Sequence, residues 1–383
     1  MSAHPLRIAI VAENHPLVLM GGAEYQTQLL TEELCIRPGA VVSYFARRVP
    51  PPQQADTLPY AVHRIGSDSG PLRRRAVIFD AATLFRALQS FRPHVIYQQA
   101  KQSYTAVCAR YAGTARIPFF FHIASDADLD RRWLSLRPSF NTPFDLLEDL
   151  TGNWGIAHAS HVIVQTEPQA ALLQRRFGRS DSILIRNFQP LPAALPRKPD
   201  GPLKILWVAN LKPVKRPELF VELAQRFAGR TDLEFQMVGR GSTNRRDVAL
   251  MRSLTTVANL HYSGEMPMDE VNRLMAEAAM HVNTSSFEGF PNTFIQAWAR
   301  GAAVLSLAVD PNHNLESAGI GYCAGSMSRL VQLVDTLASN PELRRSTAER
   351  AFAYAHENHS LQSARQLADL MLAAAHKSTA AAP

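Results

Sequence analysis

The strongest constraint on the fold is an alternation of short apolar runs with helical patterns, which fills the first half of the chain and then starts again. In the first half, five apolar, β-branched runs are predicted to be strands: 7–12, 41–45, 95–97, 119–122 and 161–165. Between them, amphipathic patterns predict helices over 23–34, 81–90 and 103–112. Such an alternation is typical of parallel sheets covered by helices.

A proline-rich stretch separates the two arrays and contains Pro190, Pro192, Pro196, Pro199 and Pro202. Proline removes backbone donors and stiffens extended chain, so we interpret this stretch as a linker. Beyond it, strands are predicted over 204–208, 233–238, 260–262, 280–284 and 303–308. Helices are predicted over 217–227, 268–278 and 294–299, with further helices from 326 to about 371.

The length of 383 residues suits two domains, because single cores stop growing at roughly 250–300 residues. We therefore predict an α/β fold in which two Rossmann-like βαβ domains face each other across a cleft. The expected parts are a first domain of residues 1–190, a linker at 191–203 and a second domain of residues 204–360. A C-terminal helix and a tail follow at 361–383, and the tail is predicted to be disordered from Lys377. Open α/β sheets bind ligands at the carboxyl ends of their strands, so two such sheets would serve two substrates.

Several classes of protein are not expected. No apolar run reaches the roughly 18–20 residues of a membrane span, and Arg7 interrupts the first apolar stretch, which argues against a signal peptide. Three scattered cysteines, Cys35, Cys108 and Cys323, have neither disulfide-framework nor metal-ligand spacing. We therefore expect a cytoplasmic protein without a cofactor or metal.

The net charge of +7 lies entirely in the first half. Residues 1–198 hold 22 Lys and Arg against 15 Asp and Glu, whereas residues 199–383 hold 18 of each. Arginine runs supply much of the excess: Arg73–Arg75, Arg131–Arg132 and Arg175–Arg176. The excess fits a solvated surface, an anionic membrane surface or an anionic acceptor. No nucleic-acid-binding motif accompanies it, so nucleic acid is not an expected partner.

The segment with the clearest chemistry runs from Ser285 to Gly301, SSFEGFPNTFIQAWARG, and lies between a predicted strand and a predicted helix. Its Gly-Phe-Pro turn leaves backbone N–H groups at the helix start, where an anion would bind. Glu288 precedes the turn and suits a hydroxyl-rich group, and Gln296 lies eight residues later. The order predicts a ligand with a polyhydroxyl group, a phosphate and a ribose.

This segment resembles the E-x7-E element of the family-4 retaining glycosyltransferases of GT-B fold. Further segments match that family in order and spacing: Gly21–Glu24, Asn210–Pro217, Leu233–Ser242, Asn259–Glu265 and Ala303–Asp310. The resemblance implies a retaining glycosyltransferase that uses a UDP- or GDP-sugar and a glycan or lipid-linked acceptor. It also implies a place in polysaccharide or glycolipid assembly, with peripheral attachment to the inner membrane face as a possibility.

The resemblance also implies roles for individual residues. Glu288, His122 and Lys215 would be catalytic: Glu288 and His122 would contact the donor sugar, and Lys215 would bind the diphosphate. The other donor-binding positions implied are Gly21, Gly22, Asn210, Arg216, Gly239, Gly241, Met266, Ser285, Gly289, Phe290, Pro291, Asn292 and Gln296. If the leaving phosphate takes the acceptor proton, retention needs no separate base and no metal.

Two positions depart from the family pattern. Gln296 replaces the second glutamate, which accepts hydrogen bonds from ribose, and Asn210 stands where the family has an arginine, with Lys212 or Arg216 as a substitute. A catalytically silent sugar-nucleotide or glycan-binding protein is therefore an alternative, and a nucleotide-sugar epimerase is a weaker one. Asp126, Asp128 and Asp130 are not predicted to bind a metal, because Arg131 and Arg137 occupy positions that a calcium loop would need.

Overall fold

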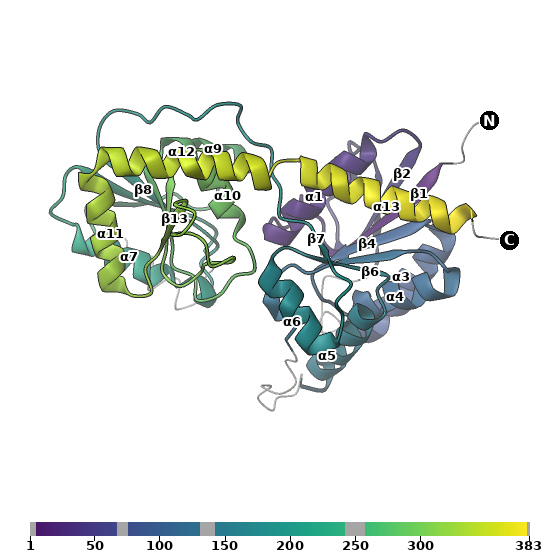
Figure 1. Ribbon diagram of the computed structural model, residues 1–383. Coiled ribbons are helices and arrows are strands. Elements are labelled where there is room, and N and C mark those ends of the chain that lie inside the picture. The colour runs from purple at the N-terminus through teal and green to yellow at the C-terminus, as the bar shows by residue number, and fades with distance from the viewer. Residues whose placement is uncertain (1–4, 67–75, 131–141, 242–256, 381–383) are drawn as a thin grey trace. The chain divides into compact units, whose positions relative to one another are not determined.

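The computed structural model describes residues 5–66, 76–130, 142–241 and 257–380. The chain forms two compact units (Figure 1). Unit 1 comprises Met1–Phe188 together with Leu361–Pro383, and unit 2 comprises Gln189–Ser360. None of the helices in the described ranges is long and apolar enough to cross a membrane.

Unit 1 is built on a seven-stranded sheet in the order β3-β2-β1-β4-β5-β6-β7, and every neighbouring pair is parallel. Its strands are β1 (Leu6–Asn14), β2 (Ala40–Arg48), β3 (Ala61–Arg64), β4 (Val95–Gln99), β5 (Phe119–His122), β6 (His161–Val164) and β7 (Ile183–Leu184). Its helices are α1 (Gly22–Cys35), α2 (Pro52–Ala55), α3 (Ala76–Phe91), α4 (Tyr104–Ala115), α5 (Thr142–Ala157), α6 (Glu167–Phe177) and α13 (Gln362–Ala380).

Both faces of this sheet are covered, which explains its nearly continuous apolar strands. On one face, Ala9 and Val11 of β1 pack with Leu88 of α3 and Cys108 of α4. On the other face, α13 packs against β1, β4 and α1. The predicted disorder is wrong for residues 377–380, because α13 continues to Ala380 and its apolar side buries Leu367, Met371 and Ala375. Residues 381–383 lie outside the described residues. The helix is ordered because that apolar side lies against the sheet.

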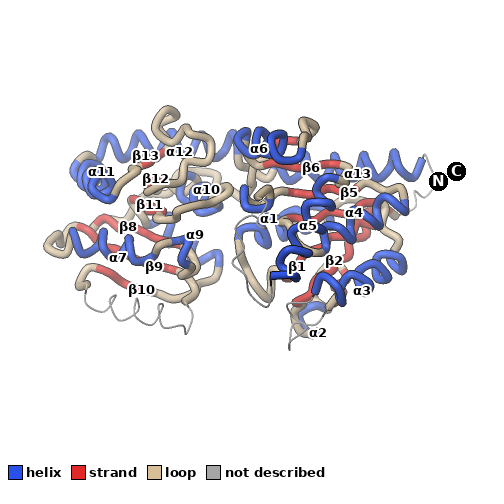
Figure 2. Tube along the Cα trace, turned by 90° about the horizontal axis from the view of Figure 1, so that it is seen from below, coloured by secondary structure: helices blue, strands red, loops and turns tan. Residues whose placement is uncertain are grey.

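Unit 2 is built on a six-stranded parallel sheet in the order β10-β9-β8-β11-β12-β13 (Figure 2). Its strands are β8 (Leu203–Val208), β9 (Leu233–Val238), β10 (Leu260–Tyr262), β11 (Met280–Asn283), β12 (Ala303–Ser306) and β13 (Gly321–Cys323). Its helices are α7 (Pro217–Arg226), α9 (Met268–Glu277), α10 (Asn292–Trp298), α11 (Met327–Ser339) and α12 (Pro341–Asn358).

Alternate residues along the strands of unit 2 pack into two separate hydrophobic cores. Ile205 and Trp207 join Phe220 of α7 in one core, whereas Leu206 joins Trp298 of α10 in the other. The helix predicted over 294–299 begins at Asn292 and ends at Trp298. It begins two residues earlier than predicted because Pro291, at the N-cap, supplies an extended φ of −68° and leads directly into the first turn.

Each sheet has one point at which the strand order reverses. In unit 1 this point lies between β1 and β4, and in unit 2 it lies between β8 and β11. At such a point the loops that leave neighbouring strands turn to opposite sides of the sheet, so a crevice opens at the carboxyl ends. Candidate binding residues are therefore expected in the loops after β1 and β4 in unit 1, and after β8 and β11 in unit 2.

Candidate functional site

The reversal point of unit 2 brings together the two segments that carry the sequence motifs. The loop after β8 contains a short 3-10 helix, Pro213–Lys215, and the loop after β11 contains Glu288. The two loops touch directly, because the backbone N–H of Ser286 donates to the carbonyl of Val214 at 2.9 Å. Residues that are 73 positions apart in the sequence therefore share one site.

Lys215 and Glu288 form an ion pair at the centre of this site. The same carboxylate oxygen, Oε1, accepts hydrogen bonds from the hydroxyl of Ser285 at 2.7 Å and from the amide of Asn283 at 3.5 Å. The side chains of Lys215 and Glu288 keep 23% and 15% of their surface exposed. Across the described residues Glu288 Oε2 accepts no hydrogen bond, so this oxygen is available for a hydroxyl group.

Arg216 fixes the two loops together. Its backbone is left-handed, with a φ of 47°, and its guanidinium donates to the carbonyls of Thr284 at 2.7 Å and Ser285 at 2.9 Å. The Thr284 hydroxyl in turn donates to the carbonyl of Lys215 at 2.7 Å. Arg216 is thus engaged with the protein backbone. Of the two cations considered as substitutes for an arginine at position 210, Lys212 is the exposed one.

The loops after β8 and β9 approach each other closely. Gly239 has a φ of 152°, and a Cβ atom at this position would lie 1.7 Å from the carbonyl oxygen of Ala209. Asn210 Oδ1 accepts a hydrogen bond from the backbone N–H of Arg240 at 3.2 Å, which ties the same two loops. Gly241 follows in that loop, and Met266 packs partly against the core that contains Trp298.

Gln296 lies on α10 and is 3% exposed. Its amide nitrogen is held by α9, since it donates to Asn272 Oδ1 at 3.1 Å and contacts Met268 Sδ at 2.9 Å. Sequence reasoning missed Asn272, because no motif marks it. The contact orients the amide so that Oε1 faces away from Asn272. In the part of the chain that the structure describes, this oxygen accepts no hydrogen bond.

The turn before α10 is anchored in the core. Phe290 is 6% exposed and lies edge-on to Trp298, with ring centroids 6.1 Å apart. The carbonyl of Asn292 accepts a hydrogen bond from the Gln189 side chain at 2.8 Å. The Phe290 side chain therefore holds the turn in place. The helix that follows, α10, has seven residues.

In unit 1, His122 ends β5 and is completely buried. Its Nδ1 lies 2.7 Å from the hydroxyl of Tyr97, and burial lowers its pKa to about 3, so the ring is neutral. The Tyr97 hydroxyl also donates to Gln99 Oε1 at 3.4 Å. The tautomer of the His122 ring decides whether Nδ1 accepts from Tyr97 or donates to it, and in the neutral ring Nε2 has the opposite role.

Gln99 stands beside His122, because the parallel register of β4 and β5 pairs these two residues. Its Oε1 accepts from Thr27 at 3.2 Å, and its Nε2 is buried without a partner in the described part. His122 Nε2 is likewise buried without a partner among the described residues. Two buried nitrogens without a partner in the described residues thus meet at the reversal point of this sheet. The signal for Gln99 in the sequence is a polar pair, Gln98-Gln99, that closes an apolar strand.

The two glycines predicted to face phosphates open α1. Gly21 is the N-cap residue, and Gly22 is the first helical residue. A Cβ at Gly21 would lie 2.7 Å from Glu24 Oε2, so a larger residue would displace that carboxylate. Glu24 Oε1 accepts a hydrogen bond from Asn14 at 3.3 Å, at the end of β1.

The acids at 126, 128 and 130 organise a loop. Asp128 is buried, and its carboxylate accepts hydrogen bonds from the backbone N–H groups of Lys101, Ala124 and Ser125. Asp130 lies 3.6 Å from Arg176. Across the described ranges, no group of three His, Cys, Asp or Glu residues is arranged to hold a metal ion. The arginines at 73–75 and 131–132 lie outside the described residues.

Two family models match the chain, one for each unit. Residues 194–354 match the model described as "Glycosyl transferases group 1", and residues 21–187 match that described as "Glycosyl transferase 4-like domain". A comparison with curated proteins found no match.

Solved structures share the fold across nearly the whole chain. WaaG, a glycosyltransferase involved in lipopolysaccharide biosynthesis, has a TM-score of 0.76 at 15% identity, over 95% of this chain and 99% of that one. Sucrose-phosphate synthase from Thermosynechococcus elongatus has 0.74 at 17% identity, over 95% and 98%. HepE from Anabaena, in complex with UDP-glucose, has 0.73 at 17% identity, over 96% and 99%. These likenesses show the predicted fold of two Rossmann-like units, the GT-B class.

Proposed function

We propose that this chain, which belongs to the group 1 glycosyl transferases, moves a sugar from a UDP- or GDP-sugar to a glycan or lipid-linked acceptor, with retention of the anomeric configuration and without a metal ion. The observation that carries the proposal is the Lys215–Glu288 pair at the reversal point of unit 2. Within one site, this pair places a cation that can bind a diphosphate next to a carboxylate that can bind sugar hydroxyls. The similar HepE was solved with UDP-glucose, which supports a nucleotide-sugar donor.

In this proposal Glu288 binds the donor sugar through Oε2, which has no partner among the described residues. Lys215 stabilises the negative charge that develops on the leaving diphosphate, assisted by the backbone N–H of Gly289. Pre-positioned charge of this kind lowers the barrier because it stabilises the transition state more than the ground state. Gly239 and Gly241 allow the loop after β9 to approach the nucleotide, and Met266 contacts the base.

No residue is assigned the role of general base. In this proposal the neutral His122 ring carries its hydrogen on Nε2 and donates it to a sugar oxygen. Gln99 supplies a second donor next to it. The acceptor proton then passes to the leaving phosphate oxygen, which is the strongest base near the reacting carbon once the glycosidic bond lengthens. This route is consistent with retention and is part of the proposal.

Gln296 binds the ribose through Oε1 alone. The amide nitrogen of Gln296 donates to Asn272, and this orientation leaves Gln296 Oε1 where a glutamate would present a carboxylate oxygen. A neutral amide gives a weaker hydrogen bond than a carboxylate, so donor affinity should be lower than with glutamate. This arrangement favours an active enzyme over the silent alternative, because it keeps the acceptor that the ribose needs.

The test is nucleotide release from a panel of UDP-, GDP- and ADP-sugars, with glycan and lipid-linked acceptors, in the presence and absence of EDTA. We expect release from one donor class that persists with EDTA, and a product with the donor's anomeric configuration. Gln296→Glu should lower KM about threefold to tenfold and leave kcat within about twofold. A parent that binds a donor, never turns over, and gains turnover with Gln296→Glu would support the silent alternative. Absence of both binding and release with every donor would refute the proposal.

We further propose that unit 1 touches an anionic membrane surface through α5. Four large apolar side chains on this helix are exposed, Leu146, Leu147, Leu150 and Trp154, and helical geometry places them within roughly a 100° sector. The excess of 22 basic over 15 acidic residues in 1–198 favours anionic lipid. Vesicle sedimentation should show binding that rises with the anionic lipid fraction, weakens with salt, and falls for Leu150→Ser. Binding that ignores lipid charge, or no binding, would contradict this proposal.

A further inference from the structure

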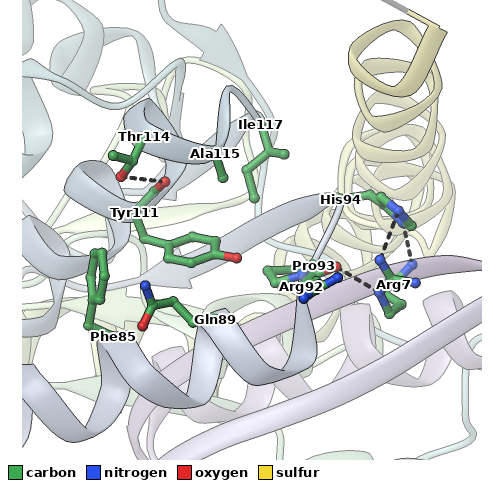
Figure 3. Close-up of a pocket in the computed structure, with 10 residues that line it drawn as sticks. All are labelled: Arg7, Phe85, Gln89, Arg92, Pro93, His94, Tyr111, Thr114, Ala115 and Ile117. Carbon is green, nitrogen blue, oxygen red and sulfur yellow. Dashed lines mark hydrogen bonds between the residues drawn. The ribbon is translucent and has the colours of Figure 1, made fainter. Parts of the chain in front are cut away.

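A pocket lies in unit 1, at the opposite edge of the sheet from Gln99 and His122. It is formed where β1 and β4 begin and where α3 and α4 end, and its volume is about 560 Å³ (Figure 3). This volume lies in the range typical of small-ligand sites. Because β4 begins at Val95 and ends at Gln99, its length separates the pocket from the Gln99–His122 pair. The pocket is therefore distinct from the site of the proposed reaction.

One end of the pocket presents hydrogen-bond donors that have no acceptor. The backbone N–H of Arg7 donates to His94 Nδ1 at 2.9 Å, so that nitrogen is unprotonated. The neutral ring must then carry its hydrogen on Nε2. Arg7 Nη2 lies 3.3 Å from this Nε2, as Figure 3 shows. Two donors thus face each other, and neither satisfies the other. A ligand oxygen with lone pairs would accept from both.

The same end is cationic. Arg7 donates through Nε to the carbonyl of Arg92 at 2.7 Å, which holds the two guanidinium-bearing residues side by side. In the described part of the chain, neither Arg7 nor Arg92 is paired with a carboxylate. Burial lowers the pKa of His94, and the nearby charges of Arg7 and His376 lower it further. An oxyanion would compensate this accumulation of positive charge.

The other end of the pocket is largely apolar. Phe85 and Tyr111 lie edge-to-face with ring centroids 5.5 Å apart, and Ile117 adds an aliphatic wall. Gln89 contributes one amide, which can donate and accept (Figure 3). A ligand that fits both ends carries an anion on a compact ring that has an apolar face and hydroxyl groups. A bare inorganic anion would leave the apolar end unused.

We propose that this pocket binds a monosaccharide unit that carries a phosphate or a carboxylate. The oxyanion accepts from Arg7 Nη2 and His94 Nε2–H, with Arg92 adding charge at the rim. The ring lies against Phe85 and Ile117, and its hydroxyls reach Gln89. The site is independent of the proposed donor site, and it would hold an acidic sugar of the acceptor, or a free sugar phosphate, away from the reaction centre.

The experiment is calorimetric titration of the full chain with glucose 6-phosphate, glucuronate, inorganic phosphate and glucose. We expect at least one of the two anionic sugars, glucose 6-phosphate or glucuronate, to bind. The one that binds more tightly shows whether the site prefers a phosphate or a carboxylate. Phosphate should bind at least threefold more weakly, and glucose not at all. Arg7→Gln should weaken the anionic sugar roughly tenfold or more, because it removes a charge-assisted bond. Arg110→Gln, which removes an exposed arginine of α4 that does not line the pocket, should have no effect.

A second measurement covers the case in which Arg7→Gln does not fold. In the unaltered protein, the anionic sugar should protect His94 from diethyl pyrocarbonate, while the exposed His158 reacts as before. Nucleotide release should be the same for Arg110→Gln as for the parent. Equal affinity for phosphate and sugar phosphate would reduce the site to an adventitious anion site and overturn the proposal. So would the absence of His94 protection at saturating ligand.

Discussion

Replacing Lys215 with methionine is expected to lower kcat by roughly 10²–10³-fold, the loss typical of removing one stabilising charge from a transition state. Lys215 is the cation at the reversal point of unit 2 and is ion-paired with Glu288. Methionine keeps most of the side-chain length and apolar stem but removes the charge that meets the leaving diphosphate. KM for the donor should rise by a smaller factor, because the charge on the diphosphate grows as the bond breaks.

The control is Arg329→Gln, which removes an exposed arginine of α11 that has no part in the proposed site. It should leave kcat within about twofold, since an exposed charge outside the site contributes little. Lys215→Arg should recover part of the activity, because it restores charge but not the geometry of the ammonium. Steady-state nucleotide release measures all three variants. If Lys215→Met keeps its kcat, or if Arg329→Gln loses as much, Lys215 is not the diphosphate cation.

Replacing Gly239 with alanine is expected to destabilise unit 2 by about 3–5 kcal/mol. Two effects combine at this position. The φ of 152° belongs to a region that is almost restricted to glycine, and the added Cβ would lie 1.7 Å from the carbonyl oxygen of Ala209. Relief requires the loops after β8 and β9 to move apart. Such a movement breaks hydrogen bonds that join these two loops, from Ala209 N–H to the carbonyl of Val238 at 3.0 Å and from Leu211 N–H to the carbonyl of Arg240 at 2.9 Å.

Gly201→Ala separates these two effects. Gly201 also has a positive φ, 117°, but a Cβ atom added there would have no neighbouring atom within 4 Å. The substitution should cost only about 1–2 kcal/mol from backbone strain. Denaturant unfolding of the full chain measures both variants, and donor affinity of any folded Gly239→Ala protein measures the loop displacement. Equal losses for the two glycines would show that the close approach to Ala209 does not matter.

Much of the fold could be predicted because it depends on local periodicity. The strands after the linker are apolar on both faces, and the helices show one apolar side, so two parallel α/β arrays follow from the sequence alone. The Glu288 segment was also recognisable, because its glycine, proline and carboxylate stand at short fixed spacing. Lys215 and Glu288 are in contact in the structure, and that they bind one ligand stays a prediction.

Other features depend on contacts between segments that are distant in the sequence, and such contacts produce no periodic pattern in it. Asn272 bonds to Gln296 because α9 and α10 pack on the same side of the sheet. Gln99 meets His122 through the register of two strands. The order of α13 arises in the same way, since its apolar side is stable only when it covers β1 and β4.

The sequence by itself determined the two α/β units, the linker composition and the residue types available for a nucleotide-sugar. Only the tertiary structure decided that Arg216 donates to backbone carbonyls, that the amide nitrogen of Gln296 donates to Asn272, and that His122 Nδ1 lies against the Tyr97 hydroxyl. The physical reason is the same in each case. A residue's type defines which hydrogen bonds it can make, but the partner that it meets across the fold defines which of them remain for a ligand.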